Sequence, residues 1–303
     1  MKIAVFKPYL QYLSEIFPEI NFYDIEEECA DVEGLIGEPY HITPEKLGKL
    51  TKLKWIQSLR TGFDNVDMEY IKKRNIIYTN AKDIYSIPIA EDVLCKILIH
   101  NTNALSYLRN QKEHIWKGNL YRKELCTQTV GLIGTGSIAT EIAKRLQGFG
   151  VKIIGYKRTP VTSLPYFDEL CSGHKGLDYI LSMSDYLIVT VDLNKETYHM
   201  LSKDNLKLMK KEASIINIAR GSIINQKDLT EVLKNKEISY AGLDVFETEP
   251  LPEDDQLWDL DNVYITPHTS GIVKNNKNRL KRLIVDNIKR YVENEHLENV
   301  VKL

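Results

Sequence analysis

Short apolar runs alternate with helical patterns along most of the 303-residue chain. This alternation is typical of parallel α/β architecture, in which helices connect successive strands. In the first third, β-rich runs predict four strands, at Lys2–Phe6, Gly34–Ile36, Trp55–Leu59 and Ile76–Asn80. Two short helices are expected between them, one with Thr43 as N-cap and Pro44 at its first position, and one at Met68–Arg74.

A second group of strands follows in the remainder of the chain. Six β-rich runs are found, at Val130–Gly134, Lys152–Tyr156, Tyr186–Thr190, Ser214–Ala219, Tyr240–Val245 and Val263–Thr266. Helical patterns separate most of them, including Ile138–Leu146, Lys203–Lys210 and Lys227–Asn235. Six parallel strands with crossover helices are the plan of a dinucleotide-binding Rossmann domain.

Two long helical patterns indicate how the domains are connected. One runs from about Ala90 to Leu105 and is a candidate connector, and the other, from about Lys274 to Glu293, could return to the first domain. A chain of this length is expected to form two domains. We therefore predict an α/β protein with a discontinuous domain of residues 1–97 plus 270–303, and a dinucleotide-binding domain of residues 98–269.

Composition excludes several classes of partner. The formal net charge of -2 gives no electrostatic reason to expect nucleic acid or an acidic membrane surface. No uncharged apolar stretch reaches the ~18 residues of a membrane span, and the N-terminus has no signal-peptide pattern. The cysteines are far apart and form no CxxC pair: Cys29, Cys95, Cys126 and Cys171. We expect a cytoplasmic protein with reduced thiols and no metal site.

A glycine-rich loop follows the first strand of the predicted dinucleotide-binding domain. Gly134, Gly136 and Ala139 occupy the small positions of a G-x-G-x-x-G/A pattern, with Ser137 and Ile138 between them. The first glycine permits a tight turn, the second lets the backbone approach a pyrophosphate, and the small third residue allows close packing. The following helix N-terminus offers free N–H groups to phosphates. The alternative is a glycine turn without a ligand, but the strand before it and the helix after it favour nucleotide binding.

The end of the next strand bears on the choice of cofactor. NAD-specific sites place Asp or Glu about 20 residues beyond the glycine loop, to hold the ribose 2′-hydroxyl. Here Lys157, Arg158 and Thr159 follow the strand, and Lys157 lies 21 residues after Gly136. An arginine can bind a 2′-phosphate with two charge-assisted hydrogen bonds. We expect NADP in preference to NAD; the alternative is a solvated Lys-Arg turn.

Three residues with catalytic potential follow the last three predicted strands: Arg220, Glu249 and His268. Ligands of open α/β sheets bind beyond the carboxyl ends of the strands, so we expect these side chains near one crevice. Arginine can clamp a carboxylate and polarise the neighbouring carbonyl, and histidine can supply a proton near neutral pH. A carboxylate on the far ring nitrogen favours imidazolium and fixes its orientation. Each residue alone could instead be a solvated charge or a structural histidine.

Together these segments resemble the D-isomer-specific 2-hydroxyacid dehydrogenase family. Asn217–Gly221 is similar to its N-x-A-R-G motif, Gly242–Pro250 to its G-x-D-V-F-x-x-E-P motif, and Pro267-His268 to its P-H pair. The resemblance covers nearly the whole chain and includes Gly62–Asp67 and Ala90-Glu91.

The resemblance implies an NAD(P)-dependent enzyme that reduces a small 2-oxo acid to a D-2-hydroxy acid. The discontinuous domain would be a flavodoxin-like substrate domain. Arg220 would bind substrate, Glu249 would partner His268, and His268 would be the acid/base. Asp244 would hold the nicotinamide carboxamide. The remaining implied contacts are to the cofactor at Val191, Ile218 and Ala219, and to the substrate carboxylate at the backbone of Arg60, Thr61 and Gly62.

The resemblance also implies a homodimer, and it leaves alternatives open. Tyr107–Leu125, with Trp116, Leu120 and Tyr121, is the candidate dimer arm. Asp192 stands where many members carry proline, whereas the Lys157-Arg158 pair is similar to that of NADP-using, glyoxylate/hydroxypyruvate-reductase-like members. The alternatives are an NAD-dependent phosphoglycerate or D-lactate dehydrogenase, and a cofactor-sensing scaffold on the same fold. Which 2-oxo acid is the substrate stays open.

Overall fold

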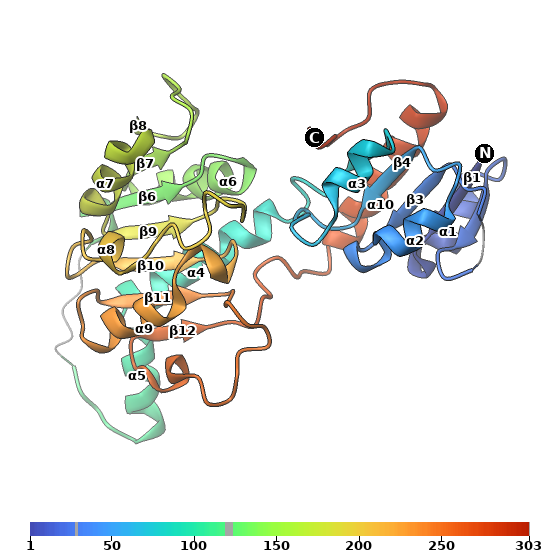
Figure 1. Ribbon diagram of the computed structural model, residues 1–303. Coiled ribbons are helices and arrows are strands. Elements are labelled where there is room, and N and C mark those ends of the chain that lie inside the picture. The colour runs from blue at the N-terminus through green and yellow to red at the C-terminus, as the bar shows by residue number, and fades with distance from the viewer. Residues whose placement is uncertain (28–29, 119–123, 303) are drawn as a thin grey trace. The chain divides into compact units, whose positions relative to one another are not determined.

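The computed structural model describes residues 1–27, 30–118 and 124–302. The chain divides into two compact units, one formed by Met1–Tyr85 with Val273–Leu303 and the other by Ser86–Ile272. Each unit contains one parallel sheet with helices on both faces (Figure 1). The α/β fold class predicted from the sequence is confirmed.

The first unit has a five-stranded sheet with the order β2-β1-β3-β4-β5. This is the flavodoxin-like order expected from the sequence. Its strands are β1 (Lys2–Val5), β2 (Asn21–Asp24), β3 (Gly34–Gly37), β4 (Trp55–Ser58) and β5 (Ile77–Thr79). Its α-helices are α1 (Lys7–Ile16), α2 (Pro44–Lys49), α3 (Met68–Lys73) and α10 (Asn276–Val292). The apolar faces of α1 and α10 pack in one core cluster, and those of α2 and α3 pack in another.

The second unit has a seven-stranded sheet with the order β12-β11-β10-β9-β6-β7-β8, visible in Figure 1 from β12 at the bottom to β8 at the top. Its strands are β6 (Thr129–Ile133), β7 (Lys152–Tyr156), β8 (Glu169–Cys171), β9 (Tyr186–Val189), β10 (Ser214–Asn217), β11 (Tyr240–Leu243) and β12 (Val263–Ile265). Its α-helices are α4 (Ser86–Asn101), α5 (Ala104–Lys112), α6 (Ser137–Leu146), α7 (Gly173–Met183), α8 (Lys203–Leu206) and α9 (Gln226–Lys234).

Strand register in the second unit brings its carboxyl ends to one edge. Ile133 at the end of β6 is paired with Tyr156 of β7 and with Val189 of β9. Val189 is paired with Asn217 of β10, and the register continues through the ends of β11 and β12. The loops that follow these strands therefore emerge along the same edge, as expected for a ligand-binding edge of a parallel sheet.

Several elements differ from the prediction. The sheet of the second unit has seven strands, because the short run Glu169–Cys171 pairs with β7. The predicted helix over 90–105 is two helices, α4 and α5, separated where Asn103 adopts a left-handed conformation with φ 57°. The helices α1 and α7 and the strand β2 were not predicted.

The division between the units falls before Ser86 and after Ile272, not at 97/98 and 269/270. Helix α4 packs on α6 and on β11, so the whole helix belongs to the second unit. None of the helices in the described part of the chain is both long enough and apolar enough to cross a membrane.

Candidate active site

The glycine loop begins where β6 ends. Gly134 has φ +104°, a conformation that residues with a side chain rarely adopt. A Cβ at this position would come within 2.6 Å of Thr190 Oγ1 and 3.1 Å of Val191 Cγ1. The Gly134 N–H donates to the carbonyl of Tyr156 at 3.0 Å. The loop is therefore enclosed by the segments that follow β7 and β9, and glycine is required at its first position.

The second glycine lies at the start of α6. Gly136 is the N-cap of this helix, and no heavy atom of the described residues lies within 4 Å of a Cβ added to it, its chain neighbours aside. Ser137 and Ile138 form the first turn, and Ala139 is completely buried. An anion can approach the backbone at this helix N-terminus. The site therefore fits a dinucleotide pyrophosphate in both shape and polarity.

The basic segment after β7 lies beside the glycine loop. The Lys157 N–H donates to the Cys171 carbonyl at 3.0 Å, which fixes the start of the segment on β8. Arg158 and Thr159 are exposed. Arg158 Nη1 forms an ion pair of 2.5 Å with Glu196 Oε2 from the loop after β9. The sequence did not predict this acidic partner.

His268 and Glu249 form a direct pair. Nδ1 of His268 lies 2.7 Å from Oε2 of Glu249, and both side chains are partly exposed. The other carboxylate oxygen, Oε1, accepts from the Phe246 N–H at 3.0 Å, which holds Glu249 against its own loop. The structure thus brings together the two residues that the sequence predicted as partners.

Asp244 holds the loop that carries His268. It is completely buried. Its Oδ1 accepts from Thr266 Oγ1 at 2.5 Å and from the Thr269 N–H at 2.9 Å, and its Oδ2 accepts from the Ser270 N–H at 3.0 Å. The Asp244 carbonyl accepts from the His268 N–H at 2.8 Å. These bonds support His268 in a left-handed conformation with φ 53°.

A buried lysine extends this network to α4. Lys96 has no exposed surface, and its Nζ lies 2.5 Å from Asp92 Oδ2 and 3.0 Å from Thr266 Oγ1. Burial raises the pKa of Asp92, and the hydrogen bond from Lys96 opposes this effect. Because Thr266 Oγ1 also donates to Asp244, the lysine is connected through one hydroxyl to the carboxylate behind His268.

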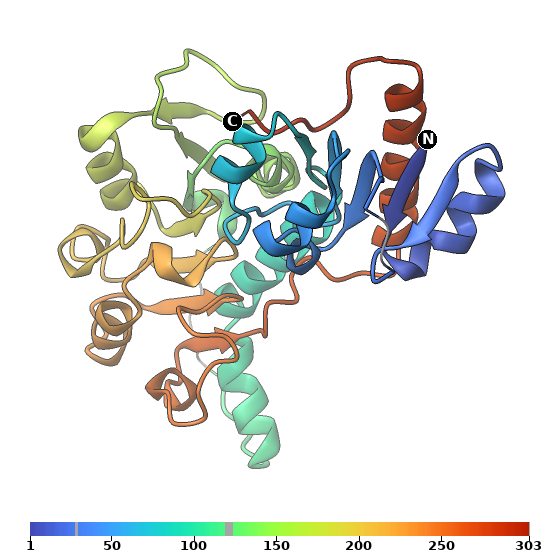
Figure 2. The same cartoon turned by 45° about the vertical axis from the view of Figure 1, so that its right-hand side comes forward.

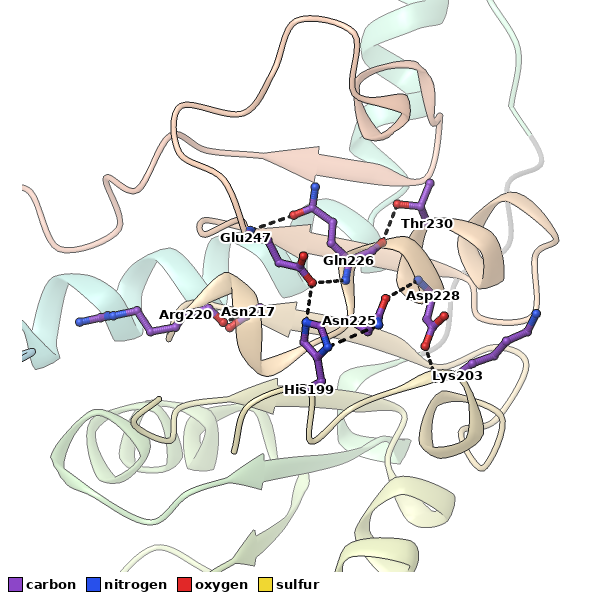
Figure 3. Close-up of polar contacts among 9 residues, drawn as sticks. All are labelled: His199, Lys203, Asn217, Arg220, Asn225, Gln226, Asp228, Thr230 and Glu247. Carbon is purple, nitrogen blue, oxygen red and sulfur yellow. Dashed lines mark hydrogen bonds and ion pairs between the residues drawn. The ribbon is translucent and has the colours of Figure 1, made fainter. Parts of the chain in front are cut away.

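The loop that carries Arg220 packs on the loop that carries Glu249. A Cβ added to Gly221 would lie 1.9 Å from the Phe246 carbonyl carbon, so only glycine permits this contact. Asn217 shapes the turn by accepting from the Ala219 N–H at 3.1 Å and donating to the Arg220 carbonyl at 2.9 Å. Ile218 and Ala219 are buried. The Arg220 side chain points away from the neighbouring polar cluster (Figure 3).

That polar cluster holds together the loops after β9, β10 and β11 (Figure 3). Glu247 Oε1 lies 2.9 Å from His199 Nε2 and accepts from the Gln226 N–H at 2.8 Å. Asn225 caps α9 by accepting from the Asp228 N–H at 3.0 Å, and its Nδ2 lies 3.5 Å from His199 Nδ1. The segment that precedes Glu249 is therefore anchored to the loops after β9 and β10.

The residues predicted to contact the substrate carboxylate lie in the first unit, after β4. The Arg60 N–H donates to Ser58 Oγ at 3.2 Å, and Arg60 Nε lies 2.7 Å from Glu38 Oε2. Thr61 Oγ1 donates to the Ala81 carbonyl at 3.0 Å, and the Thr61 carbonyl accepts from Asn80 at 2.7 Å. Gly62 follows directly. These contacts fix the loop at the carboxyl end of β4.

Sequence reasoning missed four partners: Glu38, Lys96, Glu196 and His199. Each contact joins segments distant along the chain; Lys96 and Thr266, for example, are 170 positions apart. Lys96 offered the only local signal, a charged residue within an apolar helical pattern. Among the described residues, no group of three or more His, Cys, Asp or Glu side chains is arranged to hold a metal ion.

Comparison with known proteins shows similarity over most of the chain. The profile of the family described as "D-isomer specific 2-hydroxyacid dehydrogenase, NAD binding domain" matches residues 94–270. A glyoxylate reductase from Pyrococcus horikoshii is 33% identical over 282 residues, covering 90% of this chain and 83% of that protein. A D-3-phosphoglycerate dehydrogenase from Methanocaldococcus jannaschii is 34% identical over 297 residues, covering 95% of this chain but only 55% of that protein.

A solved structure is also similar over nearly the whole chain. The D-lactate dehydrogenase from Aquifex aeolicus, complexed with NAD and lactic acid, superposes with a TM-score of 0.80 at 25% identity. The similarity covers 97% of this chain and 96% of that one.

Proposed function

Because the chain belongs to the D-isomer-specific 2-hydroxyacid dehydrogenase family, we propose that it transfers a hydride from NADPH to C2 of a small 2-oxo acid. The product is the D-2-hydroxy acid. The chain is an NAD(P)-dependent 2-oxo acid reductase. We further propose NADPH as its cofactor, a small 2-oxo acid as its substrate and His268 as the proton donor. The observation that carries it is the 2.7 Å contact between His268 Nδ1 and Glu249 Oε2.

The second unit is the proposed dinucleotide-binding domain, and the first is the proposed substrate domain. Gly134, Gly136, Ser137 and Ile138 would hold the pyrophosphate at the start of α6, where the backbone is open to a ligand. Val191, Ile218, Ala219 and Asp244 are the further proposed cofactor contacts. When bound, NADPH supplies the hydride that is added to C2.

His268 supplies the proton that balances this addition. Hydride addition to C2 leaves negative charge on the former keto oxygen, which must be protonated to give the hydroxyl group. Glu249 occupies Nδ1 of the ring, so Nε2 is the nitrogen that we assign to proton transfer. The carboxylate fixes the orientation of the ring through Nδ1.

Arg220 orients the substrate for this step. Its guanidinium can bind the substrate carboxylate in a fixed plane and stabilise charge on the adjacent oxygen. The packing of Gly221 on Phe246 fixes the backbone from which Arg220 extends. The backbone of Arg60, Thr61 and Gly62 in the first unit is the second proposed site for the substrate carboxylate.

The preference for NADPH rests on the basic segment after β7. Lys157 and Arg158 stand where an NAD-specific site would place a carboxylate, and a 2′-phosphate would meet a guanidinium there. Glyoxylate reductases among the relatives support a small substrate. NAD-dependent phosphoglycerate or D-lactate oxidation is the alternative, supported by the similarity to those two dehydrogenases.

A homodimer is also proposed. In the described part of the chain, none of the residues of α5 is buried. This helix extends beyond the β12 edge of its own sheet (Figure 2). Its exposed Tyr107 and Leu108 are followed by exposed Ile115 and Trp116; Leu120 and Tyr121 of the predicted arm lie outside the described residues. Sedimentation should show a dimer at micromolar concentration, and Trp116→Ser should weaken it. A monomeric wild-type protein would contradict the proposal.

The reaction is tested by assaying glyoxylate, hydroxypyruvate, pyruvate and branched 2-oxo acids with NADPH and with NADH. Cofactor oxidation is followed by absorbance, and the product is resolved on a chiral column. We expect turnover of at least one small acid, a higher kcat/KM with NADPH, and a D product. Faster turnover with NADH, or a product of the L configuration, would contradict the proposal.

A further inference from the structure

We propose that Glu196 is a specificity-determining residue that holds Arg158 and competes with the 2′-phosphate of the cofactor for its guanidinium. The inference rests on the proposed function, because it assumes that Arg158 reads this phosphate. It adds a second residue, from a different loop, that sets how strongly the site prefers NADPH to NADH.

The ion pair between Arg158 and Glu196 lies across the glycine loop. Strands β7 and β9 are the two neighbours of β6, and Ile133 at the end of β6 is in register with Tyr156 and Val189. Neighbouring strands lie about 4.8 Å apart, so β7 and β9 are separated by roughly 10 Å. Arg158 follows β7 and Glu196 follows β9, yet their side chains meet at 2.5 Å. The pair therefore joins the two loops on either side of Gly134.

The backbone of Glu196 is held in a defined turn. Asn194 Oδ1 accepts from the N–H groups of Glu196 at 2.8 Å and Thr197 at 3.1 Å. Thr197 Oγ1 donates to the Asp192 carbonyl at 2.7 Å, so the turn is closed on the segment that begins beside the glycine loop. The turn therefore presents the Glu196 carboxylate toward Arg158.

The ion pair between Arg158 and Glu196 is weak enough for a phosphate to replace the carboxylate. The side chains of Arg158 and Glu196 are 78% and 66% exposed, and solvent-exposed pairs of this kind contribute little to stability. A phosphate carries more charge than a carboxylate and offers more acceptor oxygens to a guanidinium. The 2′-phosphate can therefore displace Glu196 from Arg158.

Separating Glu196 from Arg158 costs free energy, and only the binding of NADPH requires this separation. Binding of NADPH separates Glu196 from Arg158 and leaves its carboxylate near a phosphate of like charge. NADH has no 2′-phosphate and leaves the pair intact. Neutralising Glu196 should therefore improve NADPH binding and leave NADH binding unchanged.

The test is a fluorescence titration of NADPH and NADH into the full-length protein and four variants. These are Glu196→Gln, Arg158→Ala, the double variant, and the control Glu231→Gln. Glu231 on α9 forms a comparable surface pair with Lys203 of α8, at 2.5 Å. We expect Glu196→Gln to lower the Kd of NADPH by roughly two- to tenfold and to leave that of NADH unchanged. The gain should be smaller when Arg158 is already replaced, and Glu231→Gln should have no effect.

The outcomes separate the two proposals. If Arg158→Ala changes the NADPH/NADH ratio but Glu196→Gln changes neither Kd, or both equally, the role of Glu196 is wrong and the cofactor assignment stands. If Arg158→Ala leaves the ratio unchanged, the assignment of Arg158 is wrong, and the role of Glu196 is wrong with it.

Discussion

Glu249 Oε2 lies 2.7 Å from Nδ1 of His268, and the opposite oxygen of the same carboxylate is held by the Phe246 N–H. The carboxylate is therefore fixed at both oxygens, and the imidazole ring is oriented by a group that does not itself depend on the substrate.

Replacing Glu249 with Gln keeps the shape of the side chain and removes its charge. The amide cannot balance the positive charge of the protonated ring as the carboxylate does, so kcat should fall by about one to two decades while the Kd of NADPH stays unchanged. The measurement is kcat and the Kd of NADPH in both proteins. An unchanged kcat would show that Glu249 does not act through His268.

Arg220→Ala should raise KM and lower kcat together, because one guanidinium is proposed to bind the carboxylate and polarise the ketone. Loss of charge-assisted hydrogen bonds worth about 1.5–3 kcal/mol should reduce kcat/KM by about one to two decades. Arg220→Lys is the matched control, since it keeps the charge and loses the planar fork. If only KM changes in the alanine variant, the residue binds substrate without assisting the chemical step.

Gly221→Ala should disturb the catalytic loops without removing any polar group. The added Cβ would lie 1.9 Å from the Phe246 carbonyl carbon and 2.1 Å from its oxygen, and backbone atoms cannot rotate away. We expect the free energy of unfolding to fall by about 1–3 kcal/mol and kcat to fall as well. Gly148→Ala is the control, because a Cβ there meets no described atom within 4 Å beyond its chain neighbours. Equal stability and activity of both variants would contradict the packing described for this loop.

Stability should depend on pH through His100. Burial lowers the pKa of this imidazole to about 4, and its Nδ1 lies 3.0 Å from Ser214 Oγ. The unfolded chain takes up this proton near the ordinary histidine pKa of 6.5, so the contribution to stability is complete above pH 6.5 and is lost as the pH falls toward 4. At pH 5 the loss should be roughly 2 kcal/mol.

Urea unfolding at pH 7 and pH 5 tests this expectation. His100→Gln should lose less stability than the wild type between the two pH values. His174→Gln should behave like the wild type, because His174 is exposed. A wild-type pH dependence that survives in His100→Gln would show that other groups cause it.

The fold was predictable where the chain carries strong local patterns. Strand β7 was predicted with its observed bounds, because a β-branched run ends abruptly at Lys157. The short β8 was missed because Glu169-Leu170-Cys171 has no pattern of its own and becomes a strand only by pairing with β7. The pattern of α4 and α5 was read as one helix, since a single left-handed residue, Asn103, interrupts it.

The candidate site was predictable to the same extent. Arg220, Glu249 and His268 stand in motifs that the sequence displays directly. The contacts that support these residues cannot be read from the sequence. The order of the strands in the sheet brings Lys96 to Thr266 and Arg158 to Glu196. Side chains that position a catalytic group from another element leave no spacing pattern in a single sequence.

The central claim is that His268 donates the proton that completes reduction of the 2-oxo acid. The most direct measurement compares wild type and His268→Ala for NADPH binding by fluorescence and for NADPH oxidation with the best 2-oxo acid of the panel. We expect an almost unchanged Kd for NADPH and a kcat reduced by ~10²–10⁴, since the proton is needed only as the alkoxide forms. A variant that binds NADPH normally and retains wild-type turnover would contradict the account.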